Sequence, residues 1–388
     1  MIYLDYNATT PLCASARAAM EPYLEEHFGN ASSIHAAGRA ARAAIDEARD
    51  GLAHSLGAKP HELIFTASGT ESNNLAVLGL ARSRRSAGRH VICSRAEHHA
   101  VLHPCEHLQT REGFEVTFLP VDRSGLIDPD ELSAAIRPDT TLVSIMSANN
   151  ETGVIQPLEA ISQACRTQGV LLHSDMVQSF GKQPTDLGLV DAASFAAHKF
   201  YGPKGAGLLY LRAGCAIEPI QFGGAHENQR RPGTENVAAI AGLAAAAEWT
   251  LLDWATEQER QRALRDRLWE VIERSETGAQ QNGRIDHRLA NTLNLSFPGL
   301  DSETILMALD LEGVGASSGS ACMVGSVSAS HVLQAMGATP EIAGSAIRFS
   351  LGKQTRAEEI ESAGEIITRV IARLRARRRE TADVHALA

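Results

Sequence analysis

The first stretch that could do chemistry places small and hydroxyl residues between an apolar run and a helical pattern. It reads Thr66-Ala67-Ser68-Gly69-Thr70, and a helix-forming segment follows at once. The N–H groups and the positive dipole end of a new helix attract anions, and phosphate suits such a turn best. Ser and Thr are also preferred N-cap residues, so an ordinary helix start is the alternative interpretation.

A second stretch ends an apolar run with an acid. Asp175 follows residues 170–174, and Gln178 comes about one helical turn later. A carboxylate in this place could pair with a cationic ring nitrogen, and the amide could reach a neighbouring oxygen. Taken alone, the pattern also describes a capping aspartate with a solvent-facing glutamine.

A third stretch delivers a lysine. Lys199 lies just past the apolar run at 192–196, beside His198, and a turn containing Gly202 and Pro203 follows. Partial burial lowers the pKa of a lysine and makes its amine a good Schiff-base nucleophile. An isolated lysine is more often a surface residue whose stem lies along the protein.

Together the three stretches supply the parts of a pyridoxal-phosphate (PLP) site. Such a site needs a phosphate cradle, an acid for the pyridinium nitrogen and a lysine that bonds the cofactor covalently. All three stretches follow strands, and ligands of parallel sheets bind beyond the carboxyl ends of the strands. The sequence therefore predicts one cofactor site at this edge of a sheet.

The elements that must position these residues alternate between strand and helix. This alternation predicts a mainly parallel sheet with helices on both faces. The expected strands are residues 63–66, 90–94, 115–120, 142–147, 170–174, 192–196 and 207–211. The expected helices between them include residues 36–56, 70–84, 128–137 and 158–168.

The length of 388 residues predicts two domains, because one hydrophobic core rarely serves so long a chain. Residues 235–274 contain no proline and predict a long helical spine between the domains. Strands near 292–297 and 346–351 and a terminal amphipathic helix then follow, with a Ser/Gly-rich loop at 316–330. The expected division is a large domain at 13–252 and a small α+β domain at 1–12 and 253–388, which carries that loop.

Composition narrows the class of protein. The net charge of −10 argues against a direct nucleic-acid binder, which needs a basic surface. The N-terminus shows no signal-peptide pattern, and the longest apolar run, at 237–247, is too short to cross a membrane. The six cysteines are scattered without paired spacing, as is typical of a reducing cytosol. We therefore expect a cytoplasmic protein without a membrane segment.

The ordered motifs of this chain resemble those of cysteine desulfurases of the NifS/IscS type. These are class V aminotransferase-like PLP enzymes of fold type I, and the resemblance covers nearly the whole chain. The most specific motif is Ser317-Ser318-Gly319-Ser320-Ala321-Cys322. The other matching segments are residues 3–10, 97–98, 143–153, 198–205, 233–236 and 348–352. The resemblance implies a large domain with a mainly parallel seven-stranded sheet and a smaller α+β domain.

The resemblance also implies the roles of the cofactor-binding residues. Lys199 would bond the cofactor and move the Cα proton, while His98 would stack on the ring and act as acid or base. Asp175 would bind the ring nitrogen, and Gln178 the ring hydroxyl oxygen. The residues expected to bind the phosphate are Gly69, Thr70, His198 and, from the other subunit of a homodimer, Thr234.

The implied substrate is L-cysteine, with Arg348 holding its carboxylate and Asn150 touching the substrate or the ring oxygen. Cys322 would attack the substrate's Sγ and keep the sulfur as a persulfide, and the product would be L-alanine. The sulfur would pass to an acceptor protein for iron–sulfur cluster, thio-cofactor or tRNA biosynthesis. No resident metal is expected, although Cys322 could ligate an iron–sulfur cluster transiently with a scaffold partner.

Several residues depart from the family pattern. Gly69 is shifted by one place, and Ala196 stands where a phosphate-binding serine is common. Pro232 precedes Gly233, and Met323 begins an unusual sequence after the loop cysteine. These departures concern cofactor affinity and partner choice.

Two other functions remain open from the residues alone. Another PLP enzyme, such as a selenocysteine lyase or an aminotransferase, would use the same cofactor residues, and an aminotransferase would not need Cys322. A non-catalytic scaffold of the same fold is the third hypothesis. A metal site is a weaker possibility, since His99, His103 and His107 recur at helical spacing but Pro104 interrupts them.

Overall fold

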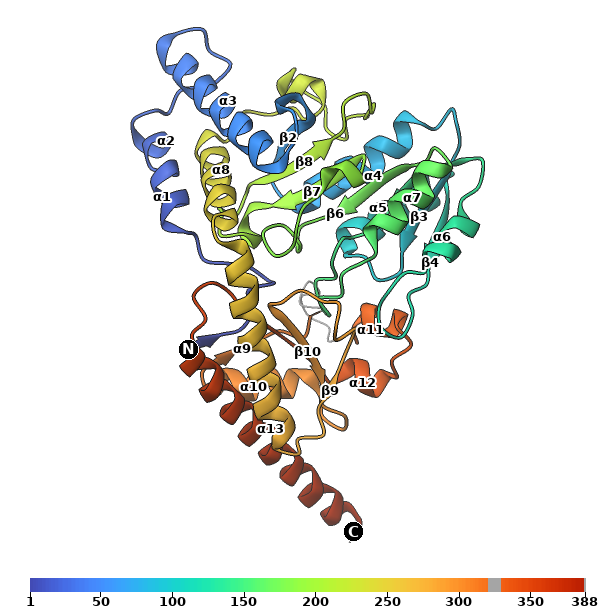
Figure 1. The fold of residues 1–388 in the computed structure, drawn as a ribbon, viewed down its shortest axis with the longest axis vertical. Helices are drawn as coiled ribbons and strands as arrows, with labels where there is room; N and C mark the ends of the chain where they lie inside the picture. Colours follow the sequence, from blue (N-terminus) through green and yellow to red (C-terminus); the bar gives the residue numbers. More distant parts are fainter. Residues whose placement is uncertain (320–328, 387–388) are drawn as a thin grey trace.

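Seven strands form the central sheet of the structure, a computed structural model that describes residues 1–319 and 329–386 (Figure 1). Across the sheet the order is β2-β8-β7-β6-β5-β3-β4, with β8 antiparallel to both of its neighbours and the other pairs parallel. The strands are β2 (Leu63–Thr66), β3 (His90–Ser94), β4 (Glu115–Leu119), β5 (Thr140–Ser144), β6 (Leu171–Asp175), β7 (Ala192–Ala196) and β8 (Gly207–Leu211). The predicted mainly parallel sheet is confirmed, and each predicted strand lies within three residues of its place.

Helices cover both faces of this sheet, because successive side chains of a strand point to opposite faces. Phe65 of β2 packs in one hydrophobic cluster, whereas its neighbour Ile64 packs in another. The helices of the first cluster include α3 (Ala36–Leu56), α6 (Pro129–Ala135), α7 (Leu158–Thr167) and α8 (Val237–Leu251). Those of the second are α4 (Gly69–Ser83) and α5 (His99–Arg111). Apolar layers therefore bury both faces of the sheet.

The expected single helix at 235–274 is wrong, because the structure divides it into two. α8 ends at Leu251, α9 (Trp254–Arg274) begins three residues later, and the axes differ by 72°. Local sequence favours helix throughout, but α8 packs on the sheet whereas α9 leads away from it toward the C-terminal elements (Figure 1). Packing therefore sets the bend at Leu252 and Asp253.

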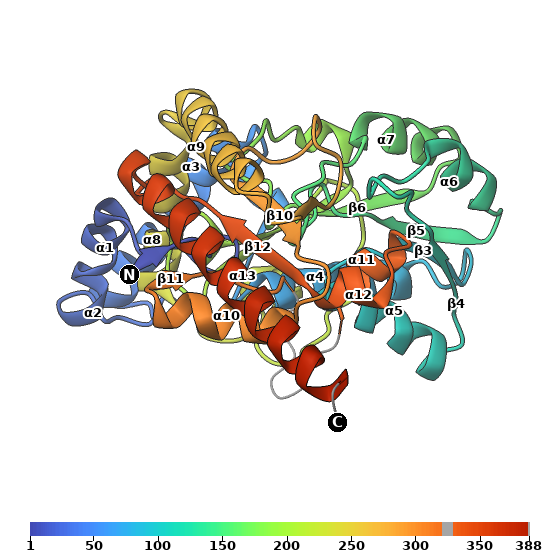
Figure 2. The same cartoon turned by 90° about the horizontal axis from the view of Figure 1, so that it is seen from below.

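A third hydrophobic cluster lies away from the central sheet and joins Leu4 to residues 268–371. It surrounds an antiparallel sheet of order β12-β10-β9 and a parallel pair of β1 with β11. Figure 2 shows α13 lying across these elements beside α10. The elements are β1 (Ile2–Tyr3), β9 (Gln280–Gln281), β10 (Thr292–Ser296), β11 (Val314–Gly315), β12 (Ala346–Ser350), α10 (Ser302–Leu311) and α13 (Ala357–Ala386). The two expected C-terminal strands and the terminal amphipathic helix are confirmed.

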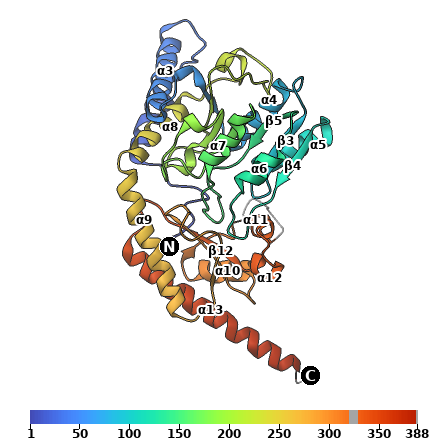
Figure 3. The ribbon, with the colours of Figure 1, turned by 45° about the vertical axis from the view of Figure 1, so that its right-hand side comes forward.

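Two short helices connect the C-terminal elements to the central sheet. Val332 and Leu333 of α11 (His331–Ala335) belong to the first cluster, and Figure 3 shows α11 and α12 (Pro340–Gly344) below the sheet. The remaining elements are α1 (Ala14–Met20), α2 (Pro22–Glu25) and the 3₁₀ turns η1 (Pro60–Glu62), η2 (Leu187–Leu189), η3 (Ala197–Lys199) and η4 (His226–Gln229).

Within the described residues, no single helix has the length and apolar character needed to cross a membrane. The bent pair of α8 and α9 meets the criterion of length and composition only when its two helices are taken together.

Candidate active site

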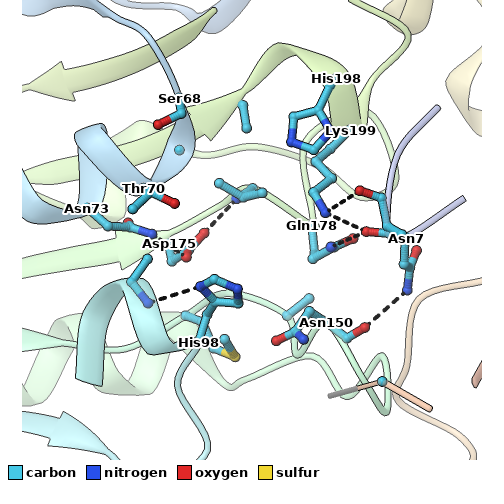
Figure 4. Close-up of a pocket in the computed structure, with 18 of the residues that line it drawn as sticks. Asn7, Ser68, Thr70, Asn73, His98, Asn150, Asp175, Gln178, His198 and Lys199 are labelled. Atoms are coloured by element: carbon cyan, nitrogen blue, oxygen red, sulfur yellow. Dashed lines mark hydrogen bonds between the residues drawn. The ribbon is translucent and has the colours of Figure 1, made fainter. Parts of the chain in front are cut away.

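A cavity of about 350 Å³ opens at the carboxyl ends of β6 and β7, where the sequence predicts the site. Its size is ordinary for a small-molecule or cofactor pocket. Figure 4 shows polar side chains converging on it from the sheet, from α4 and from the N-terminal segment. The predicted site residues that line it are Gly69, Thr70, His98, Asn150, Asp175, Gln178, His198, Lys199 and Arg348.

The start of α4 forms one end of the cavity. Ser68 caps the helix, because its Oγ accepts a hydrogen bond from the N–H of Glu71 at 3.1 Å. A Cβ at Gly69 would lie 2.8 Å from Val177 Cγ2 and 3.1 Å from Ala196 Cβ, so only glycine lets α4 approach the ends of β6 and β7 this closely. N–H groups of a first helical turn have no intrahelical acceptor. This end therefore suits an anion.

Asp175 ends β6 as a buried carboxylate. Its Oδ1 accepts from the N–H of Val177 at 2.9 Å, and its Oδ2 accepts from the Asn73 amide at 2.6 Å. Burial raises the pKa of Asp175, whereas these two hydrogen bonds and the charge of Lys199 oppose the rise. A cationic ring nitrogen in the cavity would stabilise the charged form of such a carboxylate.

His98 is the N-cap of α5, and its ring faces the cavity (Figure 4). Its Nδ1 accepts a hydrogen bond from the N–H of Ala100 at 3.0 Å. Burial, together with the charge of Lys199 and nearby histidines, lowers the pKa of His98 to about 4. The ring is therefore neutral near pH 7, and the capping bond assigns its hydrogen to Nε2.

A second histidine, His173, lies in the middle of the sheet with no exposed surface. Its ring bonds the hydroxyls of Ser144 at 2.8 Å and Ser194 at 2.9 Å, which ties β5, β6 and β7 together. Burial lowers the pKa of His173 to about 3. The ring stays neutral in the folded protein across the physiological range.

We expect the stability difference between the native protein and His173→Gln to shrink as the pH falls. An unfolded histidine titrates near pH 6.5 and the folded one near 3, so in this window only the unfolded state takes up the proton. Native stability from this group is therefore lost as the pH falls below about 6.5, by about 2 kcal/mol at pH 5. Urea unfolding of both proteins at pH 7.5 and pH 5 measures the difference. A difference in unfolding free energy that does not change with pH would contradict a neutral His173 with a lowered pKa.

Lys199 ends the turn η3 after β7 and reaches back to the N-terminal segment. Its Nζ donates to the backbone carbonyls of Asn7 at 2.6 Å and Ala8 at 2.8 Å (Figure 4). The first residues of the chain thus cover the amine. The sequence predicts Lys199 as a site residue, but it does not predict the contact of its amine with the N-terminal segment.

Arg348 and Asn150 also line the cavity. Arg348 is buried, with Nη2 bonded to Asp5 at 2.7 Å and Nη1 donating to the carbonyl of Asn150 at 2.8 Å. Arg348 Nε and Asn150 Oδ1 are buried without a hydrogen-bond partner in the described part of the chain. Buried polar atoms are nearly always bonded. These two atoms therefore mark a place for a polar ligand.

The sequence did not predict three polar residues of the site. Asn73 holds Asp175, Asp5 pairs with Arg348, and Asn7 bonds residues from several parts of the chain. Asp5 and Asn7 lie in a segment that matches the family pattern, but nothing in their spacing indicates contact with β12 or β6. Asn73 lies one helical turn beyond the anion cradle, and this spacing could have indicated that its side chain reaches the site.

The cavity does not gather every predicted residue. Thr234 is exposed and does not line it, while the adjacent Glu235 pairs with Arg42 at 2.7 Å. Cys322 lies outside the described residues. Pro104 is accommodated inside α5, but no group of three His, Cys, Asp or Glu within residues 1–319 and 329–386 is arranged to hold a metal.

Comparisons with known proteins agree on one family. Residues 2–362 match the family model of the class V aminotransferases. The cysteine desulfurase IscS of Dictyoglomus turgidum is 48% identical over 377 residues, which are 96% of this chain and 95% of that protein. A solved NifS-like protein superposes with a TM-score of 0.90 at 36% identity, covering 96% of this chain and 99% of its own. A structure of SspA in complex with cysteine gives a TM-score of 0.81 at 35% identity, covering 90% of this chain and 99% of its own. The chain belongs to the class V aminotransferases of PLP fold type I and, within them, to the cysteine desulfurases of the IscS type.

Proposed function

We propose that this protein takes the sulfur from L-cysteine, releases L-alanine and holds the sulfur as a persulfide on Cys322. The observation that carries the proposal is the convergence of Lys199, Asp175 and Arg348 on one cavity, because an amine, a buried acid and a carboxylate-binding arginine suit an amino-acid substrate. The relative solved with cysteine supports the same substrate.

Pyridoxal phosphate is the cofactor of this enzyme family, and the residues present fit it. Gly69, Thr70 and His198 would hold the phosphate at the start of α4, and Asp175 the ring nitrogen. Gln178 would bind the ring oxygen, and Lys199 would bond the cofactor covalently. The unpartnered Oδ1 of Asn150 also faces this polar cavity. When bound, the cofactor supplies an electron-accepting ring that stabilises negative charge at the substrate Cα.

We assign each of these site residues a task in the reaction. Arg348, with its buried Nε, binds the substrate carboxylate and orients the Cα–H bond toward Lys199. The Lys199 amine takes the Cα proton and later returns it to Cα, while the carbon that loses sulfur takes up the proton that the attacking thiol gave up. The neutral ring of His98 covers the cavity beside them.

The sulfur step involves Cys322 as the nucleophile. Its thiolate attacks the substrate Sγ, an S–S bond forms, and the Cβ–S bond breaks with its electron pair remaining on carbon. That carbon takes up a proton, so cysteine and a thiol become alanine and a persulfide without any external oxidant or reductant. A thiol of ordinary pKa is only a few per cent thiolate at neutral pH, so the site or the substrate must help deprotonate it.

Mass spectrometry of the protein after incubation with L-cysteine tests this function. We expect one extra sulfur atom on the peptide containing Cys322, together with stoichiometric alanine. Alanine without protein-bound sulfur would point to a different PLP reaction, and absence of alanine would exclude a desulfurase.

We further propose a homodimer in which Thr234 completes the phosphate site of the partner. Thr234 is exposed in one chain, and the nearby Phe222 is 89% exposed, as expected of a surface that another chain covers. Phe28 and Ile34 are 81% and 91% exposed. Analytical ultracentrifugation should give a dimer, and an active monomer would contradict this arrangement.

We also propose the division into a large domain at 13–252 and a small one at 1–12 and 253–388, which the separate third hydrophobic cluster supports. The described cysteines form no disulfide, which fits a protein of the reducing cytoplasm. The expected recipient of the sulfur is an acceptor protein for iron–sulfur cluster or thio-cofactor and tRNA synthesis.

Restoring a hydroxyl at position 196 should strengthen cofactor binding. Ala196 is buried at the end of β7 and faces the start of α4, so it cannot donate to a phosphate placed there. A hydrogen bond to a charged group is worth about 1.5–3 kcal/mol, which corresponds to about 10- to 150-fold in affinity. We therefore expect Ala196→Ser to lower the dissociation constant of PLP in a Lys199→Ala background, where no covalent bond masks the effect. An unchanged constant would mean that Ser68 and Thr70 already saturate the phosphate.

A further inference from the structure

A second lysine lies behind the wall of the cavity. Lys182 follows Gln178 in the tight turn after β6 and is partly buried. It lines not the main cavity but a small neighbouring space that Lys199 also lines. Neither the sequence motifs nor the proposed chemistry uses it.

The amine of Lys182 bonds two amide side chains of the site. Its Nζ donates to Gln178 Oε1 at 3.1 Å and to Asn7 Oδ1 at 3.3 Å. A lysine amine carries donors and, when charged, has no acceptor. Both amides must therefore turn their oxygens toward Lys182 and their nitrogens away from it.

This orientation decides what Gln178 presents to the cavity. Its Nε2 donates one hydrogen to the carbonyl of Asn7 at 2.9 Å, and an amide nitrogen carries a second hydrogen. Gln178 lines the cavity beside Lys199 (Figure 4). With its oxygen held by Lys182, Gln178 faces a ligand as a donor.

Asn7 is turned in the same way. Its Oδ1 accepts from Lys182 and from Asn291, so its Nδ2 donates to Thr292 Oγ1 at 2.9 Å and to the carbonyl of Asn150 at 3.4 Å. The backbone carbonyl of Asn7 accepts from Lys199. Lys182 thus connects the ring-oxygen side of the cavity to the segment that covers Lys199.

We propose that Lys182 is a positioning residue of the cofactor site, which holds the oxygens of Gln178 and Asn7 so that Gln178 donates a hydrogen bond to the ring oxygen of the cofactor. The inference rests on the proposed function, because it assigns Gln178 to that oxygen. Burial and the charges of Lys199 and Arg348 lower the pKa of Lys182 to about 7. The uncharged amine keeps two hydrogens for these bonds but gains a lone pair that can accept, so the selection of orientation is strongest below this pKa.

The test compares two ligands rather than two activities. PLP and its 3-deoxy analogue differ by the ring hydroxyl alone, so the ratio of their dissociation constants reports the bond at that oxygen. Binding is measured by fluorescence titration of full-length Lys199→Ala protein. We expect this protein to prefer PLP by about tenfold, which is the range of a hydrogen bond to a charged oxygen. Addition of Lys182→Met should lower this ratio toward one, because it leaves the bond of Gln178 Nε2 to the Asn7 carbonyl as the remaining orienting contact.

Matched variants separate positioning from general damage. Lys182→Arg retains donors and should keep most of the preference, whereas Lys353→Met should keep all of it. Lys353 lines the far side of the same small space, where it bonds the carbonyl of Trp249 and pairs with Asp253. In a Gln178→Leu protein, Lys182→Met should change the ratio no further, because the bond that it directs is already gone.

A variant that weakens both ligands equally and leaves their ratio unchanged would overturn the inference and make Lys182 merely structural. If Lys182→Met does not fold, Lys182→Gln serves the same comparison, since an amide can turn either end toward Gln178 and selects no orientation. Complete absence of PLP binding in the Lys199→Ala protein would instead overturn the proposed cofactor site, and with it this inference.

Discussion

Replacement of Lys199 by alanine is expected to abolish alanine production while leaving the fold intact. Lys199 is the one lysine lining the cavity within the described residues, and we assign it both the covalent bond to the cofactor and the proton transfers at the substrate. Proton transfer by a positioned side chain alone contributes about 10²- to 10⁴-fold, so we expect a loss of at least about a thousandfold. Amino-acid analysis of the product after incubation with L-cysteine measures it.

The fold should survive this change. Lys199 contributes two hydrogen bonds to backbone carbonyls, and Asn7 keeps its bonds to Gln178, Thr292 and Asn291. Circular dichroism and the thermal midpoint verify folding. Lys204→Ala is the matched control, because this exposed lysine follows in the same turn and should retain activity. Full alanine production by the Lys199 variant would remove the lysine from the mechanism.

Replacement of Cys322 by alanine is expected to leave substrate binding intact but to prevent protein-bound sulfur. Arg348 and the cofactor residues, to which we assign cysteine binding, lie in the described part of the chain and are unchanged in this variant, so the absorption change on adding cysteine should persist. Protein-bound sulfur should fall to the level found in protein that was not incubated with L-cysteine. Cyanolysis of the isolated protein measures this persulfide sulfur.

The described cysteines are poor alternatives for this role. Cys13, Cys93, Cys105 and Cys165 are buried. The hydrogen bond with Cys105 and burial raise the pKa of Cys93, and burial raises the pKa of Cys165 to about 12. Burial also raises the pKa of the partly exposed Cys215, so Cys215→Ala is the control that should keep wild-type sulfur loading. Wild-type loading of the Cys322 variant would transfer the acceptor role to one of these thiols.

Local patterns in the sequence determined the sheet and one side of the site. Alternating strands and helices predict the central sheet, and a polar residue that closes an apolar run falls at or just beyond a strand end: Asp175 ends β6, and Lys199 ends the turn after β7. The prediction of the cofactor also rests on this local chemistry, since a helix start, an acid and a lysine at one sheet edge are the parts that a PLP site needs.

Tertiary packing alone decided how the cavity is closed. Asn7 bonds Asn291 and Thr292 across more than 280 residues of sequence, and Asp5 pairs with Arg348 across 343. The bend between α8 and α9 and the contact of Lys182 with Gln178 depend likewise on which surfaces meet. Hydrophobic periodicity and capping describe neighbours within a few turns of chain, whereas these contacts depend on the packing of two hydrophobic layers and a separate third cluster. The chemistry of the site was therefore readable from short segments, but the network that orients it exists only in the folded chain.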